Sequence, residues 1–119
     1  MRKTSRGLPQ KDPLIARRIE DCVEKIVKTF DTEKIILFGS FARGEVENVG
    51  TMDLLIIADT ELSFFERIKK TLIACKGGFP SIEPLLYTRK EFDDLLEQGE
   101  GFLEDVIEEG IVVYEKKSK

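Results

Sequence analysis

Residues 34–59 read KIILFGSFARGEVENVGTMDLLIIAD, and this stretch decides which fold the chain can adopt. Two apolar runs, 35–38 and 52–58, have the length and the Ile/Leu content of buried β-strands. Gly39 and Ser40 follow the first run, where a short helical turn over 40–43 is expected. A glycine after a buried strand lets a ligand approach the backbone, and the serine adds a hydroxyl where a helical turn opens. The pattern therefore predicts a strand, a phosphate-sized turn, a polar loop and a second strand.

Asp53 lies at the start of the second run and shares one strand face with Thr51, because strand side chains alternate. A carboxylate beside a phosphate site is repulsive unless a cation lies between the two. Mg²⁺ is commonly held by one or two carboxylates together with substrate phosphates. The residues leave two alternatives open for Asp53: a metal ligand, or a side chain that caps a turn.

The motif GSFARG at 39–44, followed by MDLLII at 52–57, resembles the minimal nucleotidyltransferases of the DNA polymerase beta superfamily. Members of that family carry GSxARG, then SDxDL, and a third acidic residue on a later strand. The resemblance implies transfer of a nucleoside monophosphate from ATP or another NTP to an acceptor hydroxyl. It also implies two Mg²⁺ ions held by three carboxylates, which stabilise the attacking and leaving oxygens.

Position by position, the resemblance places Gly39 and Ser40 at the phosphate-binding pair and Arg43 at the arginine of the turn. Asp53 matches the second aspartate of the family, and Glu83 matches its third acidic position. Asp53 and Glu83 are therefore the expected catalytic residues and metal ligands. The residues alone leave a second alternative open for Glu83, which is simple exposure at a sheet edge. Arg43 either neutralises phosphate charge or ties the loop to the domain.

The first aspartate of the family falls on Thr51, which is the third expected position of the metal site and a weaker ligand. Glu83 is one methylene longer than the usual aspartate, about 1.5 Å of extra reach. Glu45 and Glu47 in the loop could swing in as replacement ligands. Asp59 lies about 20 Å from Asp53 along the same strand and cannot replace the missing carboxylate.

Composition limits the remaining classes. The 119 residues are 41% apolar and carry a net charge of −4, which predicts one globular domain and argues against nucleic acid as a partner. The expected organisation is a flexible leader over 1–11, one domain over 12–114 and a tail over 115–119. The chain has no histidine, which excludes imidazole-based catalysis, and Cys22 and Cys75 read as small buried hydrophobes. No membrane span or signal peptide is expected, which predicts a cytoplasmic protein.

Periodicity and capping signals complete the expected fold. Helices are predicted over 13–30, 64–76, 89–98 and 102–109, and strands over 34–38, 52–58, 81–87 and 111–114. Ser63 and Thr88 each open a capping box. Pro84 predicts that its strand lies at an edge or carries a bulge. The fold class is α/β (α+β), with a small mixed sheet flanked by helices, as in polymerase-beta-type nucleotidyltransferases.

One further expectation concerns the helix predicted after Ser63. Its apolar side chains recur at helical spacing and are expected to cover the sheet: Phe64, Phe65, Ile68, Leu72 and Ile73.

Three functions fit these residues. The first is an active nucleotidyltransferase that binds NTP with Mg²⁺. The resemblance extends it to the antitoxin of a pair with a helical HEPN-type or substrate-binding partner protein. The second, motivated by Thr51, is a catalytically degenerate module that binds a nucleotide or partner without turnover. The third is a structural or interaction domain whose Gly-Ser turn binds nothing, and self-association of the chain also stays open.

Overall fold

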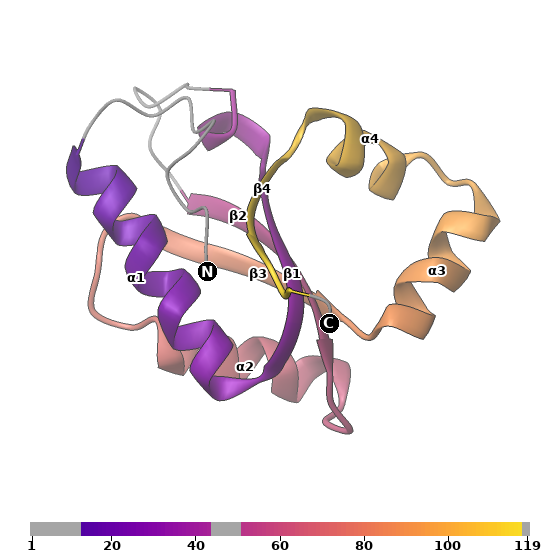
Figure 1. Cartoon of the computed structure of the whole chain (residues 1–119), viewed down its shortest axis with the longest axis horizontal. Helices are drawn as coiled ribbons and strands as arrows, with labels where there is room; N and C mark the ends of the chain where they lie inside the picture. The colour runs from indigo at the N-terminus through magenta and orange to yellow at the C-terminus, as the bar shows by residue number, and fades with distance from the viewer. Residues whose placement is uncertain (1–12, 44–50, 118–119) are drawn as a thin grey trace.

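The computed structural model describes residues 13–43 and 51–117, which form one mixed four-stranded sheet with helices on both faces (Figure 1). The strand order is β3-β2-β1-β4; β1 pairs antiparallel with β2 and β4, and β2 pairs parallel with β3. The elements in chain order are α1 (Pro13–Thr29), β1 (Asp31–Phe38), the 3₁₀ turn η1 (Gly39–Phe41), β2 (Thr51–Asp59), α2 (Phe64–Ala74), β3 (Ser81–Tyr87), α3 (Arg89–Gln98), α4 (Phe102–Glu109) and β4 (Ile111–Glu115).

The central strand β2 is buried on both faces because different helices cover them. Figure 1 shows α1 and α2 on one side of the sheet and α3 and α4 on the other. Met52, Leu54 and Ile56 belong to the larger core beneath α1. Leu55 and Ile57 belong to a smaller core with residues of α3 and α4. The predicted alternation of β2 side chains is therefore present, with an apolar layer on each face.

Two strands are longer than their apolar runs predict. β1 begins at Asp31 rather than at residue 34, because its first residues pair with the end of β2. β4 continues through Glu115, whose Cα pairs with Lys34 of β1. Both extensions consist mostly of polar residues, which hydrophobic patterning does not detect. Backbone pairing with a neighbouring strand, rather than side-chain burial, determines where these strands end.

The sheet edge and one helix start follow the sequence prediction. β3 spans Ser81–Tyr87 and lies at the edge of the sheet, which suits Pro84 because proline cannot donate a ladder hydrogen bond. The Thr88 side chain accepts from the Glu91 amide at 3.2 Å, and the Glu91 carboxylate accepts from the Thr88 amide at 2.9 Å. This reciprocal capping box starts α3.

The prediction that the apolar side chains of α2 cover the sheet is wrong for four of its five residues. Phe65 and Ile73 are 75% and 62% exposed, and Phe64 and Leu72 are also exposed, whereas Ile68 is half-buried. The side chains that α2 buries are Arg67 and Thr71. The helix is rotated so that a polar stripe faces inward and an apolar stripe faces solvent.

Arg67 explains this rotation, because its guanidinium ties three elements together. Its Nε donates to the Leu62 carbonyl at 2.8 Å, and its Nη1 donates to the Leu86 carbonyl of β3 at 3.1 Å. The same guanidinium holds the Glu91 carboxylate through two hydrogen bonds of 2.7 and 3.2 Å. A buried arginine is tolerated only when its donors are satisfied, and here they link α2, β3 and α3.

The two cysteines are buried and reduced, as the sequence predicts for small apolar side chains. They lie close together between α1 and α2, with Cys75 Sγ 3.9 Å from the Cys22 carbonyl oxygen. No helix in the described part of the chain is long and apolar enough to cross a membrane.

Replacing Arg67 with Met tests the buried network. We expect Arg67→Met to lower the free energy of unfolding by about 2–4 kcal/mol, because it leaves Glu91 and the Leu86 carbonyl without their donor. The control is Lys69→Met at an exposed position of the same helix, expected to change stability by less than about 0.5 kcal/mol. Urea denaturation followed by circular dichroism measures both, and equal effects would remove the special role assigned to Arg67.

Candidate functional site

The two acidic residues expected at the site lie next to each other on β2 and β3. The parallel register pairs Asp53 with Glu83, so their side chains leave the same face of the sheet. The two carboxyl groups are therefore neighbours on the sheet, and the charge of Glu83 acts on Asp53. Asp53 is half-buried and Glu83 is exposed at the edge of the sheet. The pair therefore combines one partly shielded carboxylate with one that solvent or a ligand can reach.

The electrostatics of this pair are unfavourable for two negative charges. Burial, followed by the hydrogen bond and charge of Glu83, raises the pKa of Asp53 from 3.8 to about 6. The Arg43 guanidinium opposes this shift and lowers the pKa of Asp53. Two adjacent carboxylates resist joint ionisation unless a cation lies between them.

Gly39 packs directly against the carboxylate of Asp53. It has φ of +77°, a left-handed conformation that side chains rarely adopt. A Cβ atom at this position would collide with Asp53 Oδ2 and lie 3.3 Å from Asp53 Cγ. Glycine is therefore required twice here, by the backbone angle and by the approach of the carboxylate.

The turn after β1 is a 3₁₀ helix, where the sequence predicts a helical turn over 40–43. Ser40 is its second residue and is half-buried. The Arg43 amide donates to the carbonyls of Gly39 and Ser40 at 3.2 and 3.1 Å. The Arg43 side chain is exposed and acts electrostatically on Asp53. The GSFAR segment thus places Gly39 against Asp53 and brings the charge of Arg43 near it.

Thr51, which the resemblance aligns with the first aspartate of the motif, is the first residue of β2 and is half-buried. It lies on the same strand face as Asp53, and its Cα pairs with Ser81 at the start of β3. Within residues 13–43 and 51–117, no three carboxylate or thiolate side chains come together as a metal site. Glu45 and Glu47, considered above as replacement ligands, lie outside the described residues.

An aromatic pair borders the carboxylates and was not identified from the sequence. Phe38, the last residue of β1, pairs directly with Asp53 across the antiparallel ladder. Its ring contacts the Phe102 ring edge to face, with centroids 5.8 Å apart, and Phe102 is 48% exposed. Residues opposite each other on antiparallel strands lie on one face, so this aromatic edge flanks the acidic pair. In the sequence, Phe102 is recognisable only as the first residue of a predicted helix. Its position near the carboxylates follows from the pairing of Phe38 with Asp53, which the sequence does not reveal.

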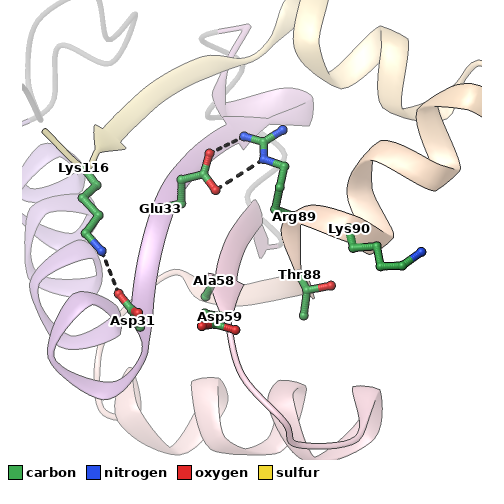
Figure 2. Close-up of a pocket in the computed structure, with 8 residues that line it drawn as sticks. All are labelled: Asp31, Glu33, Ala58, Asp59, Thr88, Arg89, Lys90 and Lys116. Carbon is green, nitrogen blue, oxygen red and sulfur yellow. Dashed lines mark hydrogen bonds and ion pairs between the residues drawn. The ribbon is translucent and has the colours of Figure 1, made fainter. Parts of the chain in front are cut away.

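A separate cavity of about 510 Å³ lies at the opposite end of the sheet (Figure 2). Asp31 and Asp59 pair at this end, whereas Asp53 pairs with Phe38 at the other. Four of the six charged side chains that line it pair with one another: Arg89 binds Glu33, and Lys116 binds Asp31 at 2.9 Å. Because these charges are paired and far from the acidic pair, the cavity is a weaker candidate for chemistry.

Comparison with known proteins agrees with this geometry. The chain has no significant match among curated proteins. Its fold matches the crystal structure of a Sulfolobus solfataricus protein provisionally assigned as a nucleotidyltransferase, with a TM-score of 0.59 and 18% sequence identity. The match covers 84% of this chain and 79% of that protein, and at this identity it establishes the fold alone. The sequence model of the family described as polymerase beta, nucleotidyltransferase, matches residues 20–119. The chain therefore belongs to the polymerase beta nucleotidyltransferase family.

Proposed function

We propose that the protein binds ATP or another NTP with Mg²⁺ and transfers a nucleoside monophosphate to a hydroxyl group. The observation that carries this proposal is the strand register that sets Asp53 beside Glu83, with the glycine of the turn packed against the Asp53 carboxylate. A carboxylate pair of this kind costs stability unless it holds a cation. Because the chain belongs to a nucleotidyltransferase family, a metal ion that takes part in the transfer would offset this cost.

The residues fit one magnesium ion. Oxygen ligands are what Mg²⁺ prefers, and two carboxylates plus substrate phosphates are a common set for it. Asp53 and Glu83 would supply the carboxylates, and the Thr51 hydroxyl would supply a weaker third position. When bound, the ion neutralises phosphate charge and lowers the energy of the displacement.

The chain's own residues have three tasks in this proposal. Gly39 lets the turn lie directly against the Asp53 carboxylate because it has no side chain, and the Ser40 hydroxyl donates a hydrogen bond to a phosphate oxygen. Arg43 neutralises negative charge at the turn, a role supported by its electrostatic effect on Asp53. Asp53 would also accept the proton of the acceptor hydroxyl, a role that requires its ionised form.

The acceptor is proposed to belong to a separate helical partner protein, as resemblance to paired antitoxins of this family implies. Co-expression with a helical protein encoded beside this chain tests it. A stable complex whose partner gains a nucleotide mass supports the proposal. A chain that remains alone and leaves the partner unmodified contradicts it.

A second candidate function is nucleotide binding without turnover. Thr51 motivates it, since two rather than three carboxylates gather in the described part of the chain. With one carboxylate missing, a second metal ion would be held weakly, and its share in stabilising the attacking and leaving oxygens would be lost. Binding of MgATP without any transfer would select this function over the first.

Transfer activity should depend on Asp53. We expect Asp53→Asn to reduce label transfer from alpha-labelled ATP at least ~100-fold, because a charged ligand to the metal is lost. The matched control is Asp59→Asn, at the far end of the same strand, which should keep wild-type activity. Calorimetric titration with MgATP separates lost binding from lost turnover. Transfer that survives Asp53→Asn excludes the mechanism, and absence of MgATP binding by the wild type favours a purely structural domain.

Stability should depend on pH through Asp53 in metal-free buffer. Because its pKa in the folded protein is raised from 3.8 to about 6, its contribution to stability is full below pH 3.8 and is lost as pH rises through 6. The side chain at position 53 of the Asp53→Asn variant cannot ionise. The melting temperature of this variant should therefore rise relative to that of the wild type as the pH increases from 4 to 7. Adding Mg²⁺ at pH 7.5 should raise the melting temperature of the wild type and leave that of the variant unchanged. A difference between the two proteins that is constant with pH contradicts the prediction.

Restoring the family's first aspartate tests the role of position 51. We expect Thr51→Asp to raise Mg²⁺ affinity about tenfold in calorimetry, because a third carboxylate joins the ligand set. Thr51→Asn, which adds an oxygen donor without charge, is the control. If neither variant changes metal affinity, position 51 is not part of the metal site.

A further inference from the structure

Arg18 of α1 is buried to an extent unusual for arginine, with 8% of its surface exposed. Its Nε donates to the Pro80 carbonyl at 2.9 Å, immediately before β3 begins. Its guanidinium also lies flat against the backbone of Gly78, where an added Cβ would be 2.6 Å from Cζ. The side chain is therefore held in one orientation by the segment that leads into β3.

The remaining donors of Arg18 are not used by the described part of the chain. Within residues 13–43 and 51–117, the hydrogen bond of Arg18 is the one made by Nε. No buried side-chain nitrogen or oxygen among these residues lacks a partner, so the Nη groups remain accessible. By contrast, Arg67, which is equally buried, uses its terminal nitrogens on Glu91 and Leu86. Arg18 is a fixed guanidinium fork with donors available to a ligand.

Arg18 lines a cavity of about 620 Å³, named here the Arg18 cavity, between α1 and the Gly77–Phe79 turn. Three further cations line it, Arg17, Lys25 and Lys76, and the acidic residue is Asp21. Asp21 pairs with Lys25 at 3.0 Å. The charges of Arg17, Arg18 and Lys76 are therefore not balanced within the cavity. Such a cluster is notable in a chain whose net charge is −4.

We propose that the Arg18 cavity binds a small phosphorylated molecule. Three unbalanced positive charges match a phosphomonoester, which carries a charge of about −1.5 to −2 at pH 7, better than a single carboxylate. The fixed fork of Arg18 suits bidentate contact with two phosphate oxygens, while Arg17 and Lys76 act as more flexible point charges.

The rest of the ligand is expected to be apolar or aromatic. Leu14 and Phe79 line the same cavity and are 75% and 69% exposed. Exposed large apolar side chains beside a polar anchor are typical of ligand sites, and the volume is in the range for small ligands. The cavity thus offers a charged floor at Arg18 and an apolar rim.

This binding site is separate from the proposed nucleotide site. None of Gly39, Ser40, Arg43, Asp53 and Glu83 lines it. Ile82, the neighbour of Glu83, packs into the core beneath α1, so the Arg18 side of the sheet is the face opposite the acidic pair. The inference therefore does not depend on the proposed nucleotidyl transfer.

Calorimetric titration of the full chain with phenyl phosphate, in buffer containing EDTA, tests the proposal. EDTA removes divalent ions, so metal-dependent binding at Asp53 does not contribute. We expect saturable binding that Arg17→Glu and Lys76→Glu each weaken at least tenfold. Arg18→Lys keeps the charge but loses the fork, and it should weaken binding without abolishing it. Vesicles containing phosphatidic acid form a second arm: preferential binding to them, lost in the same variants, assigns the phosphate to a lipid headgroup.

Matched controls make the outcome decisive. Lys69→Glu and Lys28→Glu reverse charges on α2 and α1 outside the cavity and should change affinity less than twofold. Asp53→Asn should bind phenyl phosphate like the wild type. Circular dichroism melting of each variant verifies folding, and the exposed positions Arg17 and Lys76 keep the test valid if Arg18→Lys unfolds. The proposal is overturned by absence of saturable binding, by equal losses in the control variants, or by loss of binding in Asp53→Asn.

Discussion

The parallel pairing of β2 with β3 is the constraint on which the site depends. It places Asp53 beside Glu83 and leaves both on one face of the sheet. On the other side of β2, the antiparallel pairing with β1 brings Gly39 to the same point, because Phe38 is the partner of Asp53. Three segments that are distant in the chain therefore meet within one layer of side chains.

Burial of β2 on both faces makes this convergence rigid. Apolar side chains fix the strand between the α1 and α3/α4 layers, so Asp53 cannot move away from Glu83 without disrupting a core. Because Asp53 is held in this position, its burial and the neighbouring Glu83 raise its pKa. Nearby positive charge opposes this shift, and Arg43 supplies part of that charge. A divalent ion shared with a triphosphate would supply the rest.

Two arginines are buried in the described part of the chain, and they show how the same residue type serves different purposes. Arg67 donates hydrogen bonds to the Leu62 and Leu86 carbonyls and to the Glu91 carboxylate, and so joins α2 to β3 and α3. Arg18 is anchored by the Pro80 carbonyl and lines a basic cavity. An arginine whose donors are all bound within the protein acts as a structural link, whereas one anchored through Nε alone keeps accessible donors for recognition.

The sequence by itself determined the element order, the α/β class and the capping box at Thr88, and it limited β3 to an edge position or a bulged strand. These features follow from local signals: strand-length apolar runs, Pro84 and the Thr88–Glu91 spacing. The same motifs indicated the family, which the family match then established. Only the tertiary structure decided which face of α2 is buried, because the hydrogen-bond partners of Arg67 lie 5 to 24 residues away. Likewise, the contact of Asp53 with Gly39 and Glu83, and the cavity beside Arg18, arise from strand pairing and helix packing between distant segments. Local composition carries no information about such contacts, since their energy exists only once the chain has folded.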